Sequence, residues 1–373
     1  MSHSAFREAV VDLGVITANV RHLRELLDVP HVLVVVKADG YGHGMVPAAR
    51  AALAGGANWL GVADLDEAGA LRKAGIDAPI LAWLHAPDET FDEAVASEVT
   101  LGIVSLEQLR AVVAAGERAV KVPTVHIKVE TGLSRNGVGP DGWGELFVSA
   151  AEFEREGRIR VEGIFSHLSN TSAADDLAQG ERFDEAVSEA HAAGLSPDLI
   201  HLAASTAALT QPTLRYNMVR LGISVYGIAP TEDTRPTDFG LTPAMTVRAR
   251  VAAVRTVPKG KGVSYGYLHR TAGESNLALV PLGYYEGVPR TSEAGPVVIN
   301  GSRYSVSGRI AMDQFVVDVG GNGVQVGDWA VLFGDPAHGH PSIHDWAAAA
   351  NTIGYDIATR IGGRLERRYL GNV

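Results

Sequence analysis

The feature that most restricts the fold of this 373-residue chain is a series of eight short apolar runs within its first 223 residues. The runs are rich in Val, Ile and Leu, as expected for strands that are buried on both faces of a parallel sheet. Amphipathic segments separate them: Ile16, Val20, Leu23 and Leu27, for example, fall on one face of a helix. The eight predicted strands are 31–36, 58–63, 78–83, 99–104, 123–129, 160–166, 198–203 and 217–223.

Eight strands that alternate with helices favour a (β/α)8 TIM-type barrel, because eight parallel strands close into a ring. An open, doubly wound sheet is the alternative architecture. After Pro230 the pattern changes: Met245, Val247 and Ala249 alternate with polar residues, and Gly and Pro turns separate further short runs. This texture predicts a mostly-β C-terminal domain. The polar segment 231–238 marks the predicted boundary.

Composition excludes several classes of function. The net charge of −11 argues against binding nucleic acid or an anionic membrane surface in bulk. The absence of cysteine excludes disulfides, cysteine-based metal sites and thiol nucleophiles. No apolar run is long enough to span a bilayer, and MSHSAFREAV lacks the apolar core of a signal peptide. We therefore predict a cytoplasmic protein that acts on a small molecule.

Two motifs suggest other chemistry only weakly. Residues 262–266 match the G-x-S-x-G pattern of serine hydrolases, but that pattern needs a buried strand before it and a helix after it. A tight glycine-rich turn is the favoured interpretation. His338, His340 and His344 resemble a metal-ligand cluster, yet Gly339 and Pro341 predict a solvated loop. We predict no metal site.

Lys37 is the strongest candidate for a catalytic residue, because it directly follows the first apolar run. The carboxyl end of a barrel strand faces the catalytic mouth, and apolar surroundings lower the pKa of a lysine toward the neutral amine that Schiff-base chemistry needs. Gly40, Gly42 and Gly44 are predicted to let the backbone approach a ligand, with the Tyr41 hydroxyl at the same rim. A lysine that merely extends into solvent is the alternative.

Two further residues point to an anionic ligand. Ser205 opens a predicted helix, and the free N–H groups at a helix start bind phosphate well. An ordinary N-cap serine is the alternative. Arg220 lies inside an apolar run and needs a partner, of which an acidic side chain is the usual kind.

The segment VVVKADGYGHG (34–44) resembles the pyridoxal-phosphate attachment motif of bacterial alanine racemases. The resemblance continues in family order from about residue 7 to 369. It is carried by the blocks HIKVETGLSRNGV (126–138), GIFSHLSN (163–170), HLAAS (201–205), VRLGISVYG (219–227), VSYG (263–266), PLGYYEG (281–287), GRIAMDQ (308–314) and NTIGYDIAT (351–359).

The resemblance implies an isomerase that interconverts L- and D-alanine and supplies D-alanine for peptidoglycan. It implies two-base transfer of the Cα proton on an aldimine of pyridoxal 5'-phosphate. A barrel at 12–235 would hold the cofactor, and a β-rich domain made of 1–11 and 236–373 would complete the site of the partner subunit in a homodimer. The strand 7–13 would join this β-rich domain.

The resemblance also implies roles for individual residues. Lys37 is the cofactor lysine and the base for D-alanine, and Tyr265 of the other subunit is the base for L-alanine. Lys128 matches a lysine that is carbamylated in many relatives. The implied cofactor-binding residues are Tyr41, His167, His201, Ser205, Arg220, Gly222, Ile223 and Tyr355, and the implied substrate-binding residues are Arg135, Tyr284, Met312 and Asp313.

Three competing functions remain at this level. A broader-specificity amino-acid racemase of the same family is the closest. A decarboxylase of similar architecture usually uses a cysteine, which this chain does not contain. A non-enzymatic pyridoxal-phosphate carrier would be a single barrel without the Tyr265 segment.

Overall fold

The computed structural model describes residues 5–292 and 294–371. Contacts between residues divide the chain into two units. The first contains Val20–Gly40 and Ala52–Val225. The second contains the N-terminal segment up to Asn19, Tyr41–Ala51 and the chain from Tyr226 onward.

The first unit is built on a parallel sheet of eight strands in the order β8-β7-β6-β5-β4-β3-β2-β9. A parallel bridge between Ala204 and Arg220 joins the ends of the sheet, so the ring is nearly closed and the open-sheet alternative is wrong. All eight predicted strands are confirmed. They are β2 (His31–Val35), β3 (Trp59–Val62), β4 (Ile80–Ala82), β5 (Thr100–Ile103), β6 (Thr124–Lys128), β7 (Arg160–Phe165), β8 (Leu199–His201) and β9 (Met218–Leu221).

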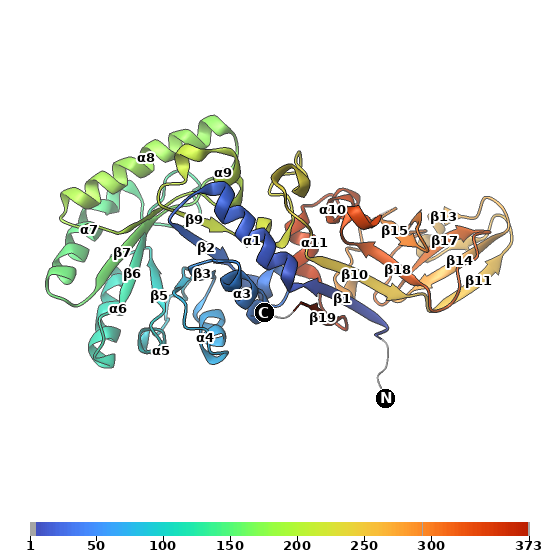
Figure 1. Ribbon diagram of the computed structural model, residues 1–373, viewed down its shortest axis with the longest axis horizontal. Coiled ribbons are helices and arrows are strands. Elements are labelled where there is room, and N and C mark those ends of the chain that lie inside the picture. The colour runs from blue at the N-terminus through green and yellow to red at the C-terminus, as the bar shows by residue number, and fades with distance from the viewer. Residues whose placement is uncertain (1–4, 293, 372–373) are drawn as a thin grey trace. The chain divides into compact units, whose positions relative to one another are not determined.

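Helices alternate with these strands along the chain, and Figure 1 shows α4 to α8 on the outside of the strand ring. Their apolar faces pack against the barrel: Leu23, Leu71, Phe147 and Phe183 are fully buried. The helices are α1 (Leu13–Leu27), α3 (Met45–Ala54), α4 (Leu65–Lys73), α5 (Asp92–Ala96), α6 (Leu106–Ala119), α7 (Pro140–Arg155), α8 (Ala173–Ala192) and α9 (Ser205–Thr210). A short left-handed turn, α2 (Lys37–Tyr41), follows β2.

The second unit is mostly β, as the alternating pattern predicts. A six-stranded sheet has the order β16-β15-β18-β10-β1-β19, a three-stranded sheet has the order β11-β14-β17, and β12 pairs with β13. The N-terminal strand β1 pairs with β10 on one side and β19 on the other. The strands are β1 (Arg7–Asp12), β10 (Met245–Arg250), β11 (Ala253–Val257), β12 (Gly262–Val263), β13 (His269–Arg270), β14 (Ser275–Val280), β15 (Pro296–Ile299), β16 (Ser302–Ser305), β17 (Phe315–Gly320), β18 (Trp329–Phe333) and β19 (Glu366–Leu370).

Two helices, α10 (Ile343–Ala350) and α11 (Gly354–Arg360), complete this unit. Trp346 of α10 is buried, and its Nε1 donates a 2.6 Å hydrogen bond to the Leu332 carbonyl. This bond satisfies the one polar atom of a large apolar side chain. The short helical turns are η1 (Pro212–Leu214), η2 (Ile223–Tyr226), η3 (Pro236–Phe239), η4 (Tyr265–Tyr267), η5 (Tyr284–Glu286) and η6 (Pro336–His338).

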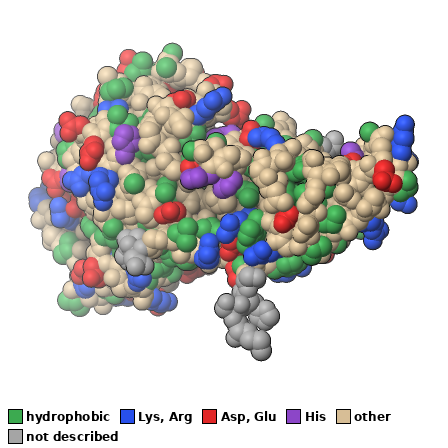
Figure 2. Space-filling view, turned by 45° about the vertical axis from the view of Figure 1, so that its right-hand side comes forward, with side chains coloured by type: hydrophobic (Ala, Val, Ile, Leu, Met, Phe, Trp, Pro, Cys, Tyr) green, Lys and Arg blue, Asp and Glu red, His purple; other side chains and the backbone are tan. Residues whose placement is uncertain are grey.

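The surface carries charges of both signs. Figure 2 shows acidic and basic side chains interspersed over the face that it presents. Of the helices in the described ranges, none combines the length and the apolar composition that crossing a membrane requires.

Candidate functional site

Lys37 lies where the sequence predicts it, at the carboxyl end of β2. Val34 of the strand and Val36 just after it are fully buried, and Lys37 Nζ lies 6.0 Å from the centre of the Trp83 ring. Burial lowers the pKa of Lys37, and the nearby charge of Arg135 lowers it further, against an opposing effect of Glu67. A lysine with a lowered pKa offers more neutral amine at physiological pH.

The backbone after Lys37 follows an unusual course. Ala38, Asp39, Gly40 and Tyr41 all have a φ between 52° and 63°, which makes one left-handed turn. Left-handed backbone costs about 1–2 kcal/mol per non-glycine residue, so other contacts must support the turn. The Glu67 carboxylate accepts the N–H of Ala38 at 2.7 Å and the N–H of Ala63 at 2.8 Å. Glu67 therefore ties the turn to the end of β3.

The glycines in this segment have a second role, within the chain itself. A Cβ on Gly42 would lie 2.3 Å from the Ala358 carbonyl oxygen, and one on Gly44 would lie 2.0 Å from the Tyr369 hydroxyl. Both glycines also have a positive φ. They therefore allow the backbone to approach other parts of the chain itself, and the expectation that they open space for a ligand is not needed to explain them.

Within the described part of the chain, Arg220 has no acidic partner, contrary to the ordinary expectation. Its two Nη atoms donate to the carbonyl oxygens of Ser166, His201 and Leu202 at 2.7–3.1 Å and to Nδ1 of His167 and His201 at 3.1 and 3.2 Å. Burial lowers the pKa of Arg220 to about 9, so the guanidinium stays protonated at neutral pH. Among the described residues, its Nε has no hydrogen-bond partner, which leaves one N–H of a buried cation for a ligand.

Positive charge accumulates around Arg220. Burial lowers the pKa of Lys128 to about 8, and the charges of Arg220, Arg135 and Lys37 also lower it. Burial lowers the pKa of His167 to about 3. The charges of Arg220, Arg135, Lys128 and Lys37 lower it as well. Glu130 is the acid that opposes the effect at Lys128. Cations gathered at a buried site fit an anionic ligand such as a phosphorylated cofactor or an amino-acid carboxylate.

Ser205 is the first residue of α9, and the N-cap position belongs to Ala204, so the N-cap alternative is wrong. The Ser205 hydroxyl accepts hydrogen bonds from Gly222 N and from Ser224 Oγ, both at 3.0 Å. These contacts bring together Ser205, Gly222 and the start of η2 at Ile223, three of the predicted phosphate-binding residues. They offer hydroxyl and N–H groups of the kind that bind phosphate.

The other two predicted phosphate-binding residues meet in the second unit. Tyr41 is 9% exposed, and its ring centre lies 6.3 Å from that of Tyr355 and 5.2 Å from that of Tyr226. Burial raises the pKa of Tyr355 to about 12. Tyr355 therefore remains a neutral O–H donor at physiological pH.

The predicted second base and the substrate-pocket residues of the second unit are exposed in this single chain. Tyr265, Tyr284 and Met312 are 71%, 42% and 52% exposed, which is high for large apolar side chains. Asp313 forms a 2.6 Å ion pair with Arg364. Each of these residues faces solvent and is accessible to a second molecule.

The alternative motifs lack the required geometry. Ser264 of the G-x-S-x-G segment donates its hydroxyl to the Arg309 carbonyl at 2.6 Å, and only the two-residue strand β12 precedes it, so the hydrolase interpretation is wrong. His338 pairs with Asp335 at 3.2 Å. Within residues 5–292 and 294–371, no group of three His, Cys, Asp or Glu side chains is arranged to hold a metal ion.

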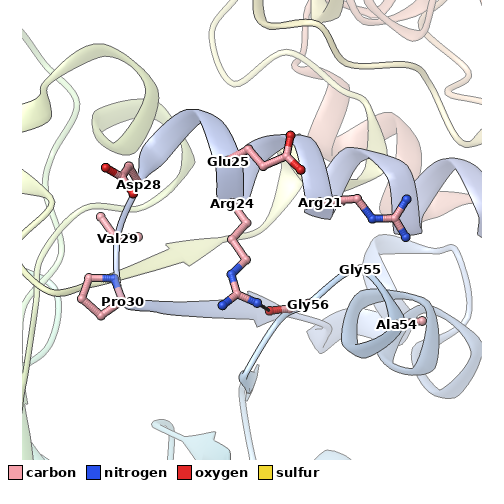
Figure 3. A pocket seen from close by; sticks show the side chains of 9 residues that line it. All are labelled: Arg21, Arg24, Glu25, Asp28, Val29, Pro30, Ala54, Gly55 and Gly56. Carbon is pink, nitrogen blue, oxygen red and sulfur yellow. Dashed lines mark hydrogen bonds between the residues drawn. The ribbon is translucent and has the colours of Figure 1, made fainter.

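A hollow of about 570 Å³ lies apart from these residues, between the end of α1 and the loop that follows α3. Figure 3 shows Arg21, Arg24, Glu25 and Asp28 along it, with Arg24 donating a 2.9 Å hydrogen bond to the Gly56 carbonyl. Its charged lining carries both signs. It therefore selects no particular ligand chemistry.

Three residues near the site were missed by the sequence analysis. Glu67 supports the turn after Lys37, His126 contacts His201, and Glu162 lies beside His126. His126 sits inside the strand that also contains Lys128, so its place in an apolar run was a signal that could have drawn attention to it. Glu67 lies on a helix among other charged residues and gave no such signal.

Comparisons with known proteins agree along the whole chain. Residues 11–230 match the family model described as "Alanine racemase, N-terminal domain", and residues 244–369 match "Alanine racemase, C-terminal domain". An alanine racemase of Thermobifida fusca is 48% identical over 374 residues, covering 99% of this chain and 100% of the relative.

Solved structures give the same result. The alanine racemase of D-cycloserine-producing Streptomyces lavendulae superimposes with a TM-score of 0.98 at 42% identity, covering 100% of this chain and 99% of that one. The enzyme of Streptomyces coelicolor A3(2) superimposes with a TM-score of 0.96 at 44% identity, covering 98% of both chains. With both of its domain models matched and full-length relatives this similar, the chain belongs to the alanine racemase family.

Proposed function

We propose that this chain interconverts L- and D-alanine with pyridoxal 5'-phosphate attached to Lys37. The observation that carries the proposal is the position of Lys37 at the end of a barrel strand, where burial and the charge of Arg135 lower its pKa. When bound, pyridoxal phosphate acidifies the Cα–H bond of an attached amino acid by withdrawing electrons into its ring. The residues of this chain then have to bind, orient and exchange a proton.

The residues present fit this cofactor. The free Nε of Arg220 supplies a permanent donor for the ring nitrogen, and His201 and His167 accept from its other N–H groups. We propose that the Ser205 hydroxyl and the backbone at Gly222 and Ile223 hold the phosphate. The hydroxyls of Tyr41 and Tyr355 are proposed to bind the same group. Because Arg220 keeps its proton at neutral pH, it donates to the ring nitrogen without protonating it.

The proton transfer needs a base on each face of the substrate. We assign the D-alanine face to Lys37, whose lowered pKa makes its amine available as a base. We assign the L-alanine face to Tyr265 of a second copy of the chain. Arg135, Tyr284, Met312 and Asp313 are proposed to line the pocket for the substrate and its carboxylate.

The exposed Tyr265 supports a homodimer in which residues 1–11 and 236–373 of each copy complete the site of the other, whose barrel spans 12–235. Mixing inactive Lys37→Ala and inactive Tyr265→Ala chains is expected to restore activity, because each mixed dimer has one site with both bases intact. At equal amounts, random exchange gives about a quarter of the wild-type sites. Racemase activity after subunit exchange measures this. Mixed dimers that form and stay inactive would show that the sites are not shared.

Lys128 is proposed to be carbamylated. Its pKa of about 8 leaves a substantial neutral fraction that can add CO2 and release a proton. The anionic product would pair with Arg135 and Arg220, which now repel the ammonium form. With 13C-labelled bicarbonate, a carbamate signal is expected that grows as the pH rises from about 7 to about 9. It should disappear in Lys128→Ala and persist in the surface control Lys121→Ala, and equal spectra for wild type and Lys128→Ala would refute it.

Racemisation of alanine in preference to other amino acids is tested by a substrate panel. Purified protein with pyridoxal phosphate is expected to convert L-alanine to D-alanine with a far higher kcat/KM than it shows for serine, lysine or arginine. We propose supply of D-alanine for peptidoglycan as its role. Comparable kcat/KM values across the panel would instead support the broader-specificity racemase.

A further inference from the structure

A line of hydrogen bonds crosses the interior of the barrel and ends at Arg220. Nη1 of Arg220 lies 3.2 Å from Nδ1 of His201, and Nε2 of His201 lies 2.9 Å from Nδ1 of His126. His126 and His201 are both fully buried. The far ring nitrogen of His126, Nε2, lies 3.8 Å from a carboxylate oxygen of Glu162.

Arg220 determines which atom donates and which accepts in each of these hydrogen bonds. A guanidinium can only donate, so His201 must accept at Nδ1 and carry its proton on Nε2. His201 Nε2 then donates to His126 Nδ1, and His126 in turn carries its proton on Nε2, facing Glu162. Two neutral imidazoles with the same tautomer therefore connect a buried cation to a carboxylate. If either ring gained a second proton, two N–H donors would face each other with no acceptor between them.

Burial supports the neutral state of both rings, because it lowers the pKa of His126 and of His201. Among the described residues, His126 Nε2 has no hydrogen-bond partner, and at 3.8 Å from Glu162 it interacts with the charge of that carboxylate. The contact with His126 in turn lowers the pKa of Glu162. Glu162 is thus the negative end of the line.

Two irregularities of β7 make room for this arrangement. The register between β6 and β7 pairs Val125 with Val161 but His126 with Gly163, so Glu162 is an extra residue without a partner on β6. Such a bulge redirects side chains, here that of Glu162 toward His126. A Cβ on Gly163 would lie 2.7 Å from Nδ1 of His126, the atom that accepts the hydrogen bond from His201 Nε2. Gly163 therefore leaves the space that the His126 ring occupies.

We propose that Glu162 and His126 are positioning residues that hold Arg220 through His201, so that its Nη atoms stay engaged and its Nε stays directed to the ligand. Among the described residues, neither is a hydrogen-bond partner of Arg220 itself, so both would act through His201. The inference rests on the proposed role of Arg220 toward pyridoxal phosphate, but the tautomers of the two histidines do not depend on that role.

The first test measures the tautomers directly. In 15N-histidine-labelled wild-type protein, with and without pyridoxal phosphate, the resonances of His126 and His201 should report neutral rings protonated on Nε2 at pH 7. His126→Asn and His201→Asn identify the two sets of resonances. A charged ring, or a proton on Nδ1 of either residue, would refute the line.

The second test separates positioning from folding. Glu162→Leu removes the carboxylate and is expected to weaken pyridoxal-phosphate binding about tenfold and to lower kcat about tenfold with little change in KM, the scale of leaving one buried polar group without its partner. Glu162→Gln removes the charge but keeps an acceptor oxygen, and it should recover only part of both. Gly163→Ala should behave like Glu162→Leu and also shift the His126 resonances.

Asp92→Asn is the control, because Asp92 is an exposed carboxylate that pairs with Arg118 outside this line of residues, and it should change neither binding nor kcat. If folded Glu162→Leu protein binds pyridoxal phosphate as tightly as the wild type and has the same kcat, the positioning role is refuted. Wild-type protein that shows the expected tautomers yet binds no pyridoxal phosphate would refute the proposed function and leave the hydrogen-bond line intact.

Discussion

Replacement of Lys37 by alanine is expected to lower racemase activity by more than about 10⁴-fold, because the variant loses both the cofactor attachment point and one base. Reduction of the wild-type holoenzyme with borohydride should fix pyridoxal phosphate covalently to the peptide that contains Lys37. Peptide mapping by mass spectrometry gives the labelled residue. The expected label on Lys37 follows from its place after β2 and its lowered pKa.

Two other lysines serve as controls for this experiment. Lys121 is solvent-exposed and pairs with Glu98 at 2.9 Å, so Lys121→Ala should keep full activity and full labelling of Lys37. Lys128 lies in the same charged cluster, with a pKa of about 8, and is therefore the most instructive competitor. Label found on Lys128 or Lys121 would contradict the assignment of Lys37.

The barrel could be predicted from sequence because two independent sequence signals indicate each strand. Each strand is a short run of branched apolar residues, and each is followed by a segment with helical spacing, so the order of elements is visible without knowledge of contacts. Closure of the ring was harder to predict. It depends on a bridge between Ala204 and Arg220, and the sequence around these two residues does not indicate that they pair.

The positions of single catalytic residues could be predicted where a residue type conflicts with its surroundings. A lysine after β2 and an arginine inside β9 stand out because charged groups in apolar runs need a reason. Their partners could not be predicted in the same way. Arg220 is held by backbone carbonyls and two histidines, and backbone groups leave no trace in the side-chain sequence.

Glycines gave a less specific signal. The sequence predicts that Gly42 and Gly44 let the backbone approach a ligand, which stays a prediction, and the structure shows that both also make room for the chain, against Ala358 and Tyr369. Gly163, which drew no attention, makes room for a functional side chain, that of His126. A missing Cβ signals a close approach, and only the three-dimensional structure shows what approaches.

Replacement of Tyr265 by phenylalanine is expected to reduce L-to-D turnover by about 10²–10⁴-fold, the usual contribution of a positioned general base. The change removes one hydroxyl from a side chain that is 71% exposed, so the fold of the single chain should be unaffected. Tyr267→Phe is the matched control: Tyr267 lies in the same turn, is 59% exposed and has no assigned role. It should leave turnover unchanged.

Steady-state rates alone do not identify which face of the substrate Tyr265 serves. The two products are mirror images, so the equilibrium constant is one, and losing either base slows both directions. Exchange of the Cα proton with deuterated water separates the faces, because each base can exchange its own enantiomer without completing the conversion. In Tyr265→Phe, Lys37 should still introduce deuterium into D-alanine, while exchange into L-alanine falls with turnover. If L-alanine exchanges at the wild-type rate in this variant, another group is the L-side base, and the reason for the exposed tyrosine has to be sought elsewhere.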